Sequence, residues 1–225
     1  MRRRQMAERF LNRTEAGRQL AAELTRYASR SDVLVLGLPR GGVPVAFEVA
    51  MALDAPLDVF IVRKLGLPGH EEFGIGAIAS GGVRVVDEAV LRAYGIDADL
   101  LDRITARERG ELERREHLYR DDRPFPSIVD RVVILVDDGL ATGSTMRAAI
   151  AALRAEKPRD VVVATPVGAP ETCAAIAKLA DDLVCLETPE PFYAVGLWYQ
   201  NFEQTDDDEV HDLLERAAAR TVPRR

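Results

Sequence analysis

The sequence predicts an α/β fold, an open and mainly parallel sheet with helices on both faces. Short apolar runs alternate with helical patterns along the chain, and the run at 132–136 is the clearest of them. Five consecutive apolar residues suit a strand buried on both faces and are too few for a helix. Strand–helix alternation of this kind favours parallel strands joined by right-handed crossovers. A chain of 225 residues suits one domain with a large core, so we expect a single domain over 1–225.

Each expected element follows from the local pattern. The first helix is expected from Phe10 to Tyr27, where apolar residues recur near helical spacing. The closing helix is expected to begin at Asp206, because acidic residues near the amino end of a helix are stabilised by its dipole. Between them we expect strands at 33–36, 58–62, 132–136, 160–165 and 183–186, and helices over 45–50, 91–94, 146–153 and 171–180.

Three segments depart from simple alternation. A flap is expected at 64–82, since its first part holds four glycines and a proline, a composition common in active-site lids, and its end forms a hairpin between 77–79 and 83–86. A densely charged helix from Asp99 to Arg120 lies in a helical insertion at about 87–128, and its thin apolar stripe suggests a solvated arm or a dimer contact. A small C-terminal hood at about 187–205 concentrates the aromatic residues.

Composition excludes several classes of function. The net charge of −7 argues against a general nucleic-acid binder, and no apolar stretch approaches the length of a transmembrane helix. Cys173 and Cys185 are too few and too isolated in the sequence for a disulfide framework or a zinc site, which favours a reducing compartment. We therefore expect a cytoplasmic enzyme with no nucleic-acid or membrane partner.

The candidate site begins where the strand at 132–136 ends in Asp137 and Asp138. After a short turn, a small hydroxyl-rich segment opens the next helix. Free N–H groups and the helix dipole favour an anion there, and hydroxyl side chains add donors. Carboxylates would repel a phosphate, so they are better placed to accept hydrogen bonds from sugar hydroxyls. The pattern indicates a ribose phosphate site formed by Asp137, Asp138, Gly139, Ala141, Thr142, Gly143, Ser144 and Thr145.

The alternative is an ordinary strand end followed by a capped helix. Two adjacent acids followed by Thr-Gly-Ser-Thr make that the minority interpretation. A P-loop is unsupported, since the chain contains no Gly-x-x-x-x-Gly-Lys-Ser/Thr run.

The stretch VILVDDGLATGST resembles the phosphoribosyl-pyrophosphate (PRPP) signature of type I phosphoribosyltransferases. The resemblance implies that Asp137 and Asp138 hold the ribose 2′- and 3′-hydroxyls and act in catalysis, and that the segment 141–145 holds the 5′-phosphate. Some 6-oxopurine members carry an acidic proton acceptor at the position of Ala141, and alanine cannot fill that role.

A second loop, with Pro39, Arg40, Gly41 and Gly42, follows the strand at 33–36. Glycines allow an anion nest of N–H groups, and Arg40 adds a planar cation, although a plain strand-to-helix turn with a solvent-facing arginine would look similar. In the resembled family this loop binds pyrophosphate, often through an unusual cis peptide, and we expect Leu38–Pro39 as the cis candidate.

The stretch RKLGLPG at 63–69 resembles the segment that leads into the closing loop of adenine-type members. It implies that Arg63 and Lys64 meet the pyrophosphate and contribute to catalysis. Purine-salvage members also have a Pro-x-x-Phe segment whose phenylalanine stacks on the base. Phe192 matches that position, with Trp198 as a neighbour, although no counterpart of their base-recognising lysine is clear.

Together these features predict transfer of ribose 5-phosphate from PRPP to a nucleobase-like acceptor, with purine as one option and with release of pyrophosphate. Mg²⁺ is the expected cofactor, bound mainly through substrate oxygens, with Asp137 as the one direct protein ligand to consider. A homodimer is expected. The alternative is a non-catalytic PRPP or nucleotide sensor. A phosphohydrolase is a third option, but it would favour acids spaced as Asp-x-Asp.

Overall fold

The computed structural model describes residues 9–67 and 69–221. Its centre is a five-stranded sheet in the order β2-β1-β6-β7-β8, in which every neighbouring pair is parallel. The strands are β1 (Val33–Gly37), β2 (Leu57–Val59), β6 (Val132–Val136), β7 (Asp160–Val167) and β8 (Asp182–Glu187). The predicted α/β fold with an open parallel sheet is confirmed.

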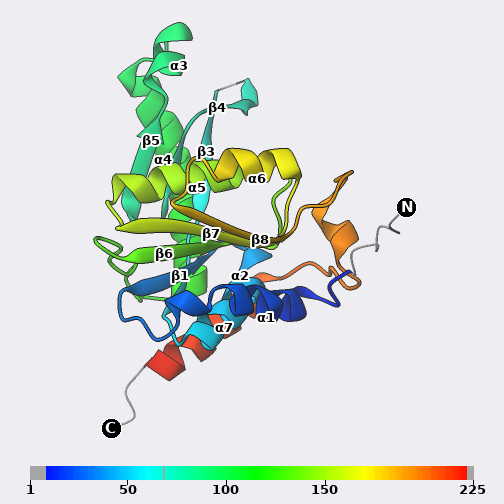
Figure 1. Ribbon diagram of the computed structural model, residues 1–225. Coiled ribbons are helices and arrows are strands. Elements are labelled where there is room, and N and C mark those ends of the chain that lie inside the picture. The colour runs from blue at the N-terminus through cyan, green and yellow to red at the C-terminus, as the bar shows by residue number, and fades with distance from the viewer. Residues whose placement is uncertain (1–8, 68, 222–225) are drawn as a thin grey trace.

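Helices cover both faces of this sheet (Figure 1). One face carries α1 (Arg13–Glu23) and α2 (Gly42–Leu53), and the other carries α5 (Ser144–Ala155) and α6 (Pro170–Ile176). Alternate residues of β1 serve the two faces, so that Val33 packs toward α1 and α2 while Leu34 packs toward α5. Burial on both sides explains the unbroken apolar runs. The closing helix α7 (Asp207–Thr221) packs on α2.

A second, antiparallel sheet is formed by β3 (Val62–Leu67), β4 (His70–Ala79) and β5 (Val83–Val86). The single strand expected at 58–62 is therefore wrong, because the chain leaves the parallel sheet after Val59 and enters the antiparallel one at Val62. The flap expected at 64–82 contains an antiparallel β-hairpin whose pairing shifts register after Leu65, and its Pro68 lies outside the described residues. The predicted hairpin between 77–79 and 83–86 is confirmed.

The insertion contains α3 (Glu88–Ala93) and α4 (Ala98–Arg120), and Figure 1 shows α3 and the second sheet standing out from the parallel sheet. The helix predicted from Asp99 to Arg120 is confirmed. Its interpretation as a solvated arm is wrong for one face, since Leu112 and Tyr119 are buried against the core that α4 shares with β3 and α7. A thin apolar stripe is enough to bury this face of α4, because the helix packs along the stripe against β3 and α7.

Arg120 joins the two sheets at the end of α4. Its side chain is 5% exposed and forms ion pairs with Asp58 of β2 at 2.7 Å and with Glu116 at 3.0 Å. It also donates to the Val59 carbonyl at 3.1 Å and to Ser80 Oγ, just beyond β4, at 3.0 Å. One buried guanidinium therefore connects the parallel sheet, the antiparallel sheet and the insertion.

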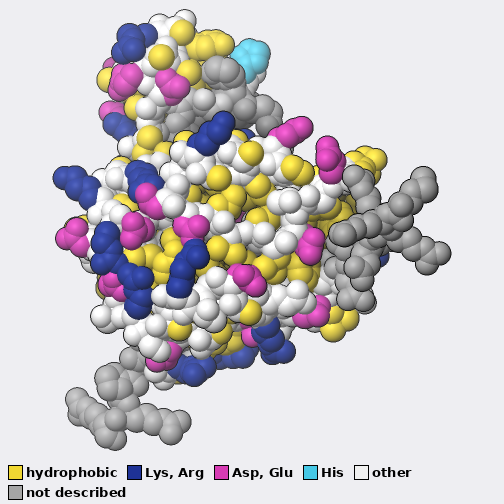
Figure 2. All heavy atoms as spheres, in the orientation of Figure 1, with side chains coloured by type: hydrophobic (Ala, Val, Ile, Leu, Met, Phe, Trp, Pro, Cys, Tyr) yellow, Lys and Arg dark blue, Asp and Glu magenta, His cyan; other side chains and the backbone are white. Residues whose placement is uncertain are grey.

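Two features bear on the partner predictions. Figure 2 shows acidic and basic side chains intermixed over the visible face rather than gathered into one basic stripe. No helix formed by residues 9–67 and 69–221 is both long and apolar enough to cross a membrane.

The two cysteines are isolated in the sequence but not in the structure. The free thiols of Cys173 and Cys185 lie 3.7 Å apart between α6 and β8, so the prediction that they are isolated is wrong.

Candidate functional site

The loops after β1 and β6 lie side by side because these strands are neighbours in a parallel sheet. The Leu38 N–H donates to the Val136 carbonyl at 2.9 Å, which joins the two loops at their roots. A Cβ atom on Gly42 would lie 2.7 Å from the same carbonyl, and one on Gly41 would collide with Asp138 Oδ2. The two candidate loops thus meet at the carboxyl edge of the sheet, where open α/β sheets bind ligands.

The paired acids are held in a fixed arrangement. The Asp138 N–H donates to Asp137 Oδ1 at 2.9 Å, and the Tyr199 hydroxyl donates to the Asp138 carbonyl at 2.6 Å. Arg13 reaches Asp138 Oδ2 through Nε at 2.9 Å and through Nη2 at 2.8 Å. Among the described residues, no hydrogen bond engages Asp137 Oδ2 or Asp138 Oδ1, so each acid keeps one oxygen for a ligand.

Burial sets the protonation of these acids. It raises the pKa of Asp137 well above its usual value, and the neighbouring Asp138 charge raises that pKa further. Burial also raises the pKa of Asp138, while the Arg13 guanidinium opposes this shift. The two shifts favour a shared proton on the pair, whereas the Arg13 guanidinium stabilises the charged form of Asp138.

The segment after the acids forms a small cavity of about 160 Å³ at the start of α5. Side chains donate hydrogen bonds to two carbonyls of this segment. Thr172 Oγ1 donates to the Ala141 carbonyl at 2.6 Å, and Arg147 donates to the Thr142 carbonyl. Gly143 adopts a φ of +69°, and a Cβ there would lie 2.6 Å from the Thr172 methyl group, so glycine is required. The cavity is lined by Asp137, Gly139, Leu140, Ala141, Thr142, Gly143, Ser144, Thr145 and Met146. Seven of the eight residues predicted to bind ribose phosphate line it.

The loop at 39–42 contains the cis peptide, at Pro39–Arg40. The prediction that Leu38–Pro39 is the cis bond is therefore wrong by one residue. The anion nest is smaller than expected, since the Gly42 and Val43 amides already donate to the Leu38 and Arg40 carbonyls at 3.0 Å each. Arg40 faces Asp207 at the start of α7 with Nη1 at 3.9 Å, and both side chains are partly exposed.

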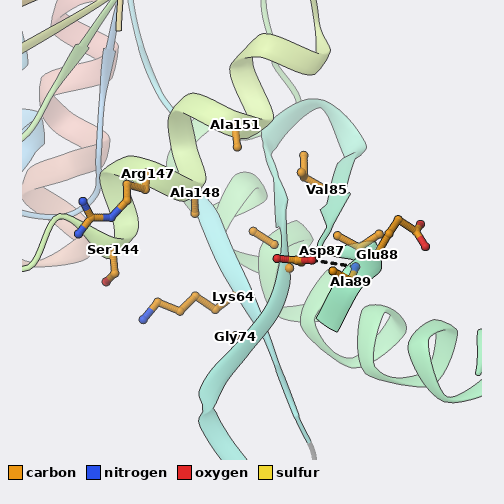
Figure 3. A pocket seen from close by; sticks show the side chains of 13 residues that line it. Lys64, Gly74, Val85, Asp87, Glu88, Ala89, Ser144, Arg147, Ala148 and Ala151 are labelled. Carbon is orange, nitrogen blue, oxygen red and sulfur yellow. Dashed lines mark hydrogen bonds between the residues drawn. The ribbon is translucent and has the colours of Figure 1, made fainter. Parts of the chain in front are cut away.

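Arg63 and Lys64 point to opposite faces of β3, as neighbours on a strand must. Arg63 forms an ion pair with Glu108 of α4, with Nη2 at 2.6 Å from Oε2. Lys64 instead lines a cavity of about 890 Å³ between α5 and the antiparallel sheet, together with Ser144 and Arg147. Figure 3 shows the lysine side chain extending toward Ser144 at the start of α5. The structure brings Lys64 toward the phosphate loop and holds Arg63 away from this cavity.

The hood closes one side of the acids. Its short helix η3 (Val195–Trp198) places Val195 directly over Gly139, where a Cβ would meet the Val195 side chain. Phe192 and Trp198 are partly buried and pack against a small cluster that includes Phe10 and Tyr199. Both predicted base-binding residues therefore lie in the hood, and part of each ring packs against the hood itself.

The sequence analysis did not identify three residues that contact the site: Arg13, Thr172 and Arg147. Arg13 and Thr172 contact the loop from other elements, Arg147 reaches back to it from α5, and Arg13 is 125 positions from its partner. On the sequence Arg13 belongs to the polar face of an amphipathic helix, so the pattern carries no signal for its role.

The groups that could bind a metal ion lie in two places. Among the described residues, one group of three could hold an ion, Asp121, His211 and Glu215, at the junction of α4 and α7 rather than at the Asp137 loop. At that loop a hard cation would find the carboxylates of Asp137 and Asp138 and would need its remaining oxygen ligands from a substrate or water.

Comparisons with known proteins agree with this geometry. Residues 7–200 match the family model of the phosphoribosyl transferase domain. The Mycobacterium tuberculosis H37Rv protein named "Putative phosphoribosyl transferase Rv0571c" is 48% identical over 208 residues, which cover 92% of this chain and 47% of that protein. The chain thus spans about half the length of the curated relatives it matches.

Solved structures extend the likeness. The crystal structure of TT1426 from Thermus thermophilus has a TM-score of 0.83 and 43% identity, covering 92% of this chain and 98% of that one. The AQ2163 protein from Aquifex aeolicus shares the fold at a TM-score of 0.50 and 12% identity, over 90% of this chain and 84% of its own. The match over 7–200 shows that the chain belongs to the phosphoribosyl transferase domain family.

Proposed function

We propose that this domain transfers ribose 5-phosphate from PRPP to a nitrogen base and releases pyrophosphate. One observation carries the proposal. Two partly buried acids, a phosphate-sized cavity at the start of α5 and a glycine-rich loop meet at one edge of the sheet. Each part matches one chemical portion of PRPP, namely its ribose hydroxyls, its 5′-phosphate and its pyrophosphate.

In this proposal the available oxygens of Asp137 and Asp138 accept hydrogen bonds from the ribose hydroxyls. The amides of the first turn of α5, which lack carbonyl partners within the helix, bind the 5′-phosphate together with Thr142, Ser144 and Thr145. The Ala141 and Thr142 carbonyls are engaged elsewhere, which supports a turn that presents its N–H groups to an anion.

The reaction breaks the bond between carbon 1 and the pyrophosphate oxygen. Positive charge grows on the sugar ring while negative charge grows on the leaving group. The paired carboxylates stabilise the first and Arg40 and Lys64 stabilise the second. Mg²⁺, bound mainly through substrate oxygens with Asp137 as its protein ligand, would neutralise pyrophosphate further. In this proposal the β3–β4 hairpin restricts water, which would otherwise hydrolyse the sugar.

The two cations of β3 offer a matched pair of variants. Lys64→Ala is expected to raise the KM for PRPP about 10-fold or more, because a charged hydrogen bond to an anion is lost. Arg63→Ala should leave the KM near the wild-type value, since Glu108 already occupies Arg63. Steady-state kinetics of the two proteins tests the assignment. Equal losses in the two variants would contradict the assignment of Lys64, rather than Arg63, to PRPP.

Gly41 tests the contact between the two loops. Gly41→Ala places a methyl group against Asp138 Oδ2, and we expect kcat/KM for PRPP to fall about 100-fold, since small displacements of reacting groups are costly. Gly110→Ala is the control, because a Cβ on that exposed position of α4 has no atom within 4 Å. Wild-type kinetics in Gly41→Ala would contradict the role of this contact.

The acceptor is the least constrained part of the proposal. A nucleobase, with purine among the options, would lie beneath the hood near Phe192 and Trp198. We also propose that the protein is a cytoplasmic homodimer that acts in nucleotide salvage. Incubating the protein with PRPP, Mg²⁺ and each nucleobase in turn, and measuring released pyrophosphate, identifies the acceptor. PRPP binding without release by any base would instead support a sensor.

A further inference from the structure

Arg13 occupies a place that its own helix does not explain. It is the first residue of α1, which Asn12 caps by accepting the Glu15 N–H at 2.9 Å. A cation at the amino end of a helix opposes the helix dipole, so this position is unfavourable for arginine within α1 itself. The side chain is nevertheless only 12% exposed, which indicates that its partners lie elsewhere.

Those partners are Asp138, which the proposed function assigns to the ribose, and two residues of the hood. Both Nε and Nη2 reach Asp138 Oδ2, at 2.9 and 2.8 Å, while Nη1 donates to the Glu203 carbonyl at 2.6 Å. The guanidinium also lies over the Phe202 ring, 3.9 Å from its centroid. All three nitrogens and the planar face of the group are therefore in use, a combination that lysine cannot reproduce.

Asp138 is consequently held twice by the same structural unit. Phe202 stacks on Tyr199 with ring centroids 4.9 Å apart, and the Tyr199 hydroxyl donates to the Asp138 carbonyl. Arg13, resting on Phe202, holds the side chain of Asp138 by Oδ2, and no described residue forms a hydrogen bond with Oδ1. The backbone and the carboxylate of one acid are thus both fixed through the hood.

We propose that Arg13 is the positioning residue of the ribose site, which fixes the rotamer of Asp138 so that Oδ1 meets a ribose hydroxyl. The inference rests on the proposed function, since it takes Asp138 to bind the sugar of PRPP. Arg13 acts through Asp138 and touches no substrate. It also makes PRPP affinity depend on the hood, because Phe202 and Glu203 hold the guanidinium in place.

The test compares Arg13→Ala, Arg13→Lys and the control Arg18→Ala. Arg18 lies on the same helix and pairs with Glu48 at 3.0 Å, but its side chain is 69% exposed. PRPP binding is measured by calorimetry without acceptor, and kcat and KM are measured with the acceptor found by pyrophosphate release. Both series are repeated with added guanidinium ion, and circular dichroism checks folding.

We expect Arg13→Ala to weaken PRPP binding about 10- to 100-fold, since a charge-assisted contact that orders the acid is lost. Guanidinium ion should restore part of that affinity, Arg13→Lys should fall between the two, and Arg18→Ala should match the wild type with no response to guanidinium. If Arg13→Ala fails to fold, Arg13→Lys and Phe202→Leu carry the same comparison.

Folded Arg13→Ala with wild-type affinity, or a loss that guanidinium does not restore and lysine does not lessen, would overturn the positioning role. Wild-type protein that binds PRPP but turns over no base would overturn the proposed reaction while leaving the Arg13 comparison intact. Wild-type protein that does not bind PRPP would overturn both.

Discussion

Replacing Asp138 by alanine is expected to lower kcat/KM for PRPP at least about 100-fold, because a charged hydrogen bond to the sugar and the partner of Arg13 are removed together. We expect both KM and kcat to change. Binding weakens as the ribose loses an acceptor, and turnover falls as the developing positive charge loses a nearby carboxylate. Steady-state kinetics and calorimetric PRPP binding measure the two effects separately.

A matched control separates the site from the fold. Asp182 also forms an ion pair with an arginine, Arg26, but it lies at the amino end of β8, at the opposite edge of the sheet. Asp182→Ala should leave the kinetics unchanged. Unaltered kinetics in Asp138→Ala would refute the assignment of the ribose site, whereas equal losses in both variants would point to a general effect on the fold.

The largest effect on stability is expected from Arg120→Ala. Removing this guanidinium leaves the carboxylates of Asp58 and Glu116 without their buried partner, and such losses cost about 3–5 kcal/mol. For a protein of this size the change lowers the melting temperature by roughly 6 to 20 °C. Denaturant unfolding followed by circular dichroism gives the free energy directly.

Arg114→Ala provides the comparison within the same helix. Arg114 pairs with Glu111 on the surface of α4 with its side chain 59% exposed, so its removal should cost less than about 1 kcal/mol. If Arg120→Ala were no more destabilising than Arg114→Ala, the connection between the two sheets would have to reside in apolar packing alone.

The parallel sheet and the loop after β6 could be predicted from the sequence because both are local patterns. The run Val132 to Val136 predicts a buried strand, and the acids and hydroxyl residues that follow lie in one continuous segment, 137–145. The approach of Gly41 to Asp138 also needs the strand order, because it depends on β1 and β6 being neighbours in the sheet.

The errors arose where tertiary contacts decide. Phe60 and Ile61 are as apolar as a strand interior, yet there the chain passes from one sheet to the other. The predicted flap is not an error of this kind, but the pairing of β3 with β4 and of β4 with β5 is also a tertiary contact that composition does not reveal. Arg13 could not be found at all, because its partner is remote in the chain and its helix looks ordinary.

The alternation of side chains along β3 has a consequence for how this hairpin could evolve. Arg63 and Lys64 are separated by a single step along the strand, and that step alone decides which cation reaches the cavity. The irregular pairing of β3 with β4 falls after Leu65, nearer the tip. Insertions at the tip would therefore leave Lys64 in place, whereas deleting one residue before it would exchange the two cations.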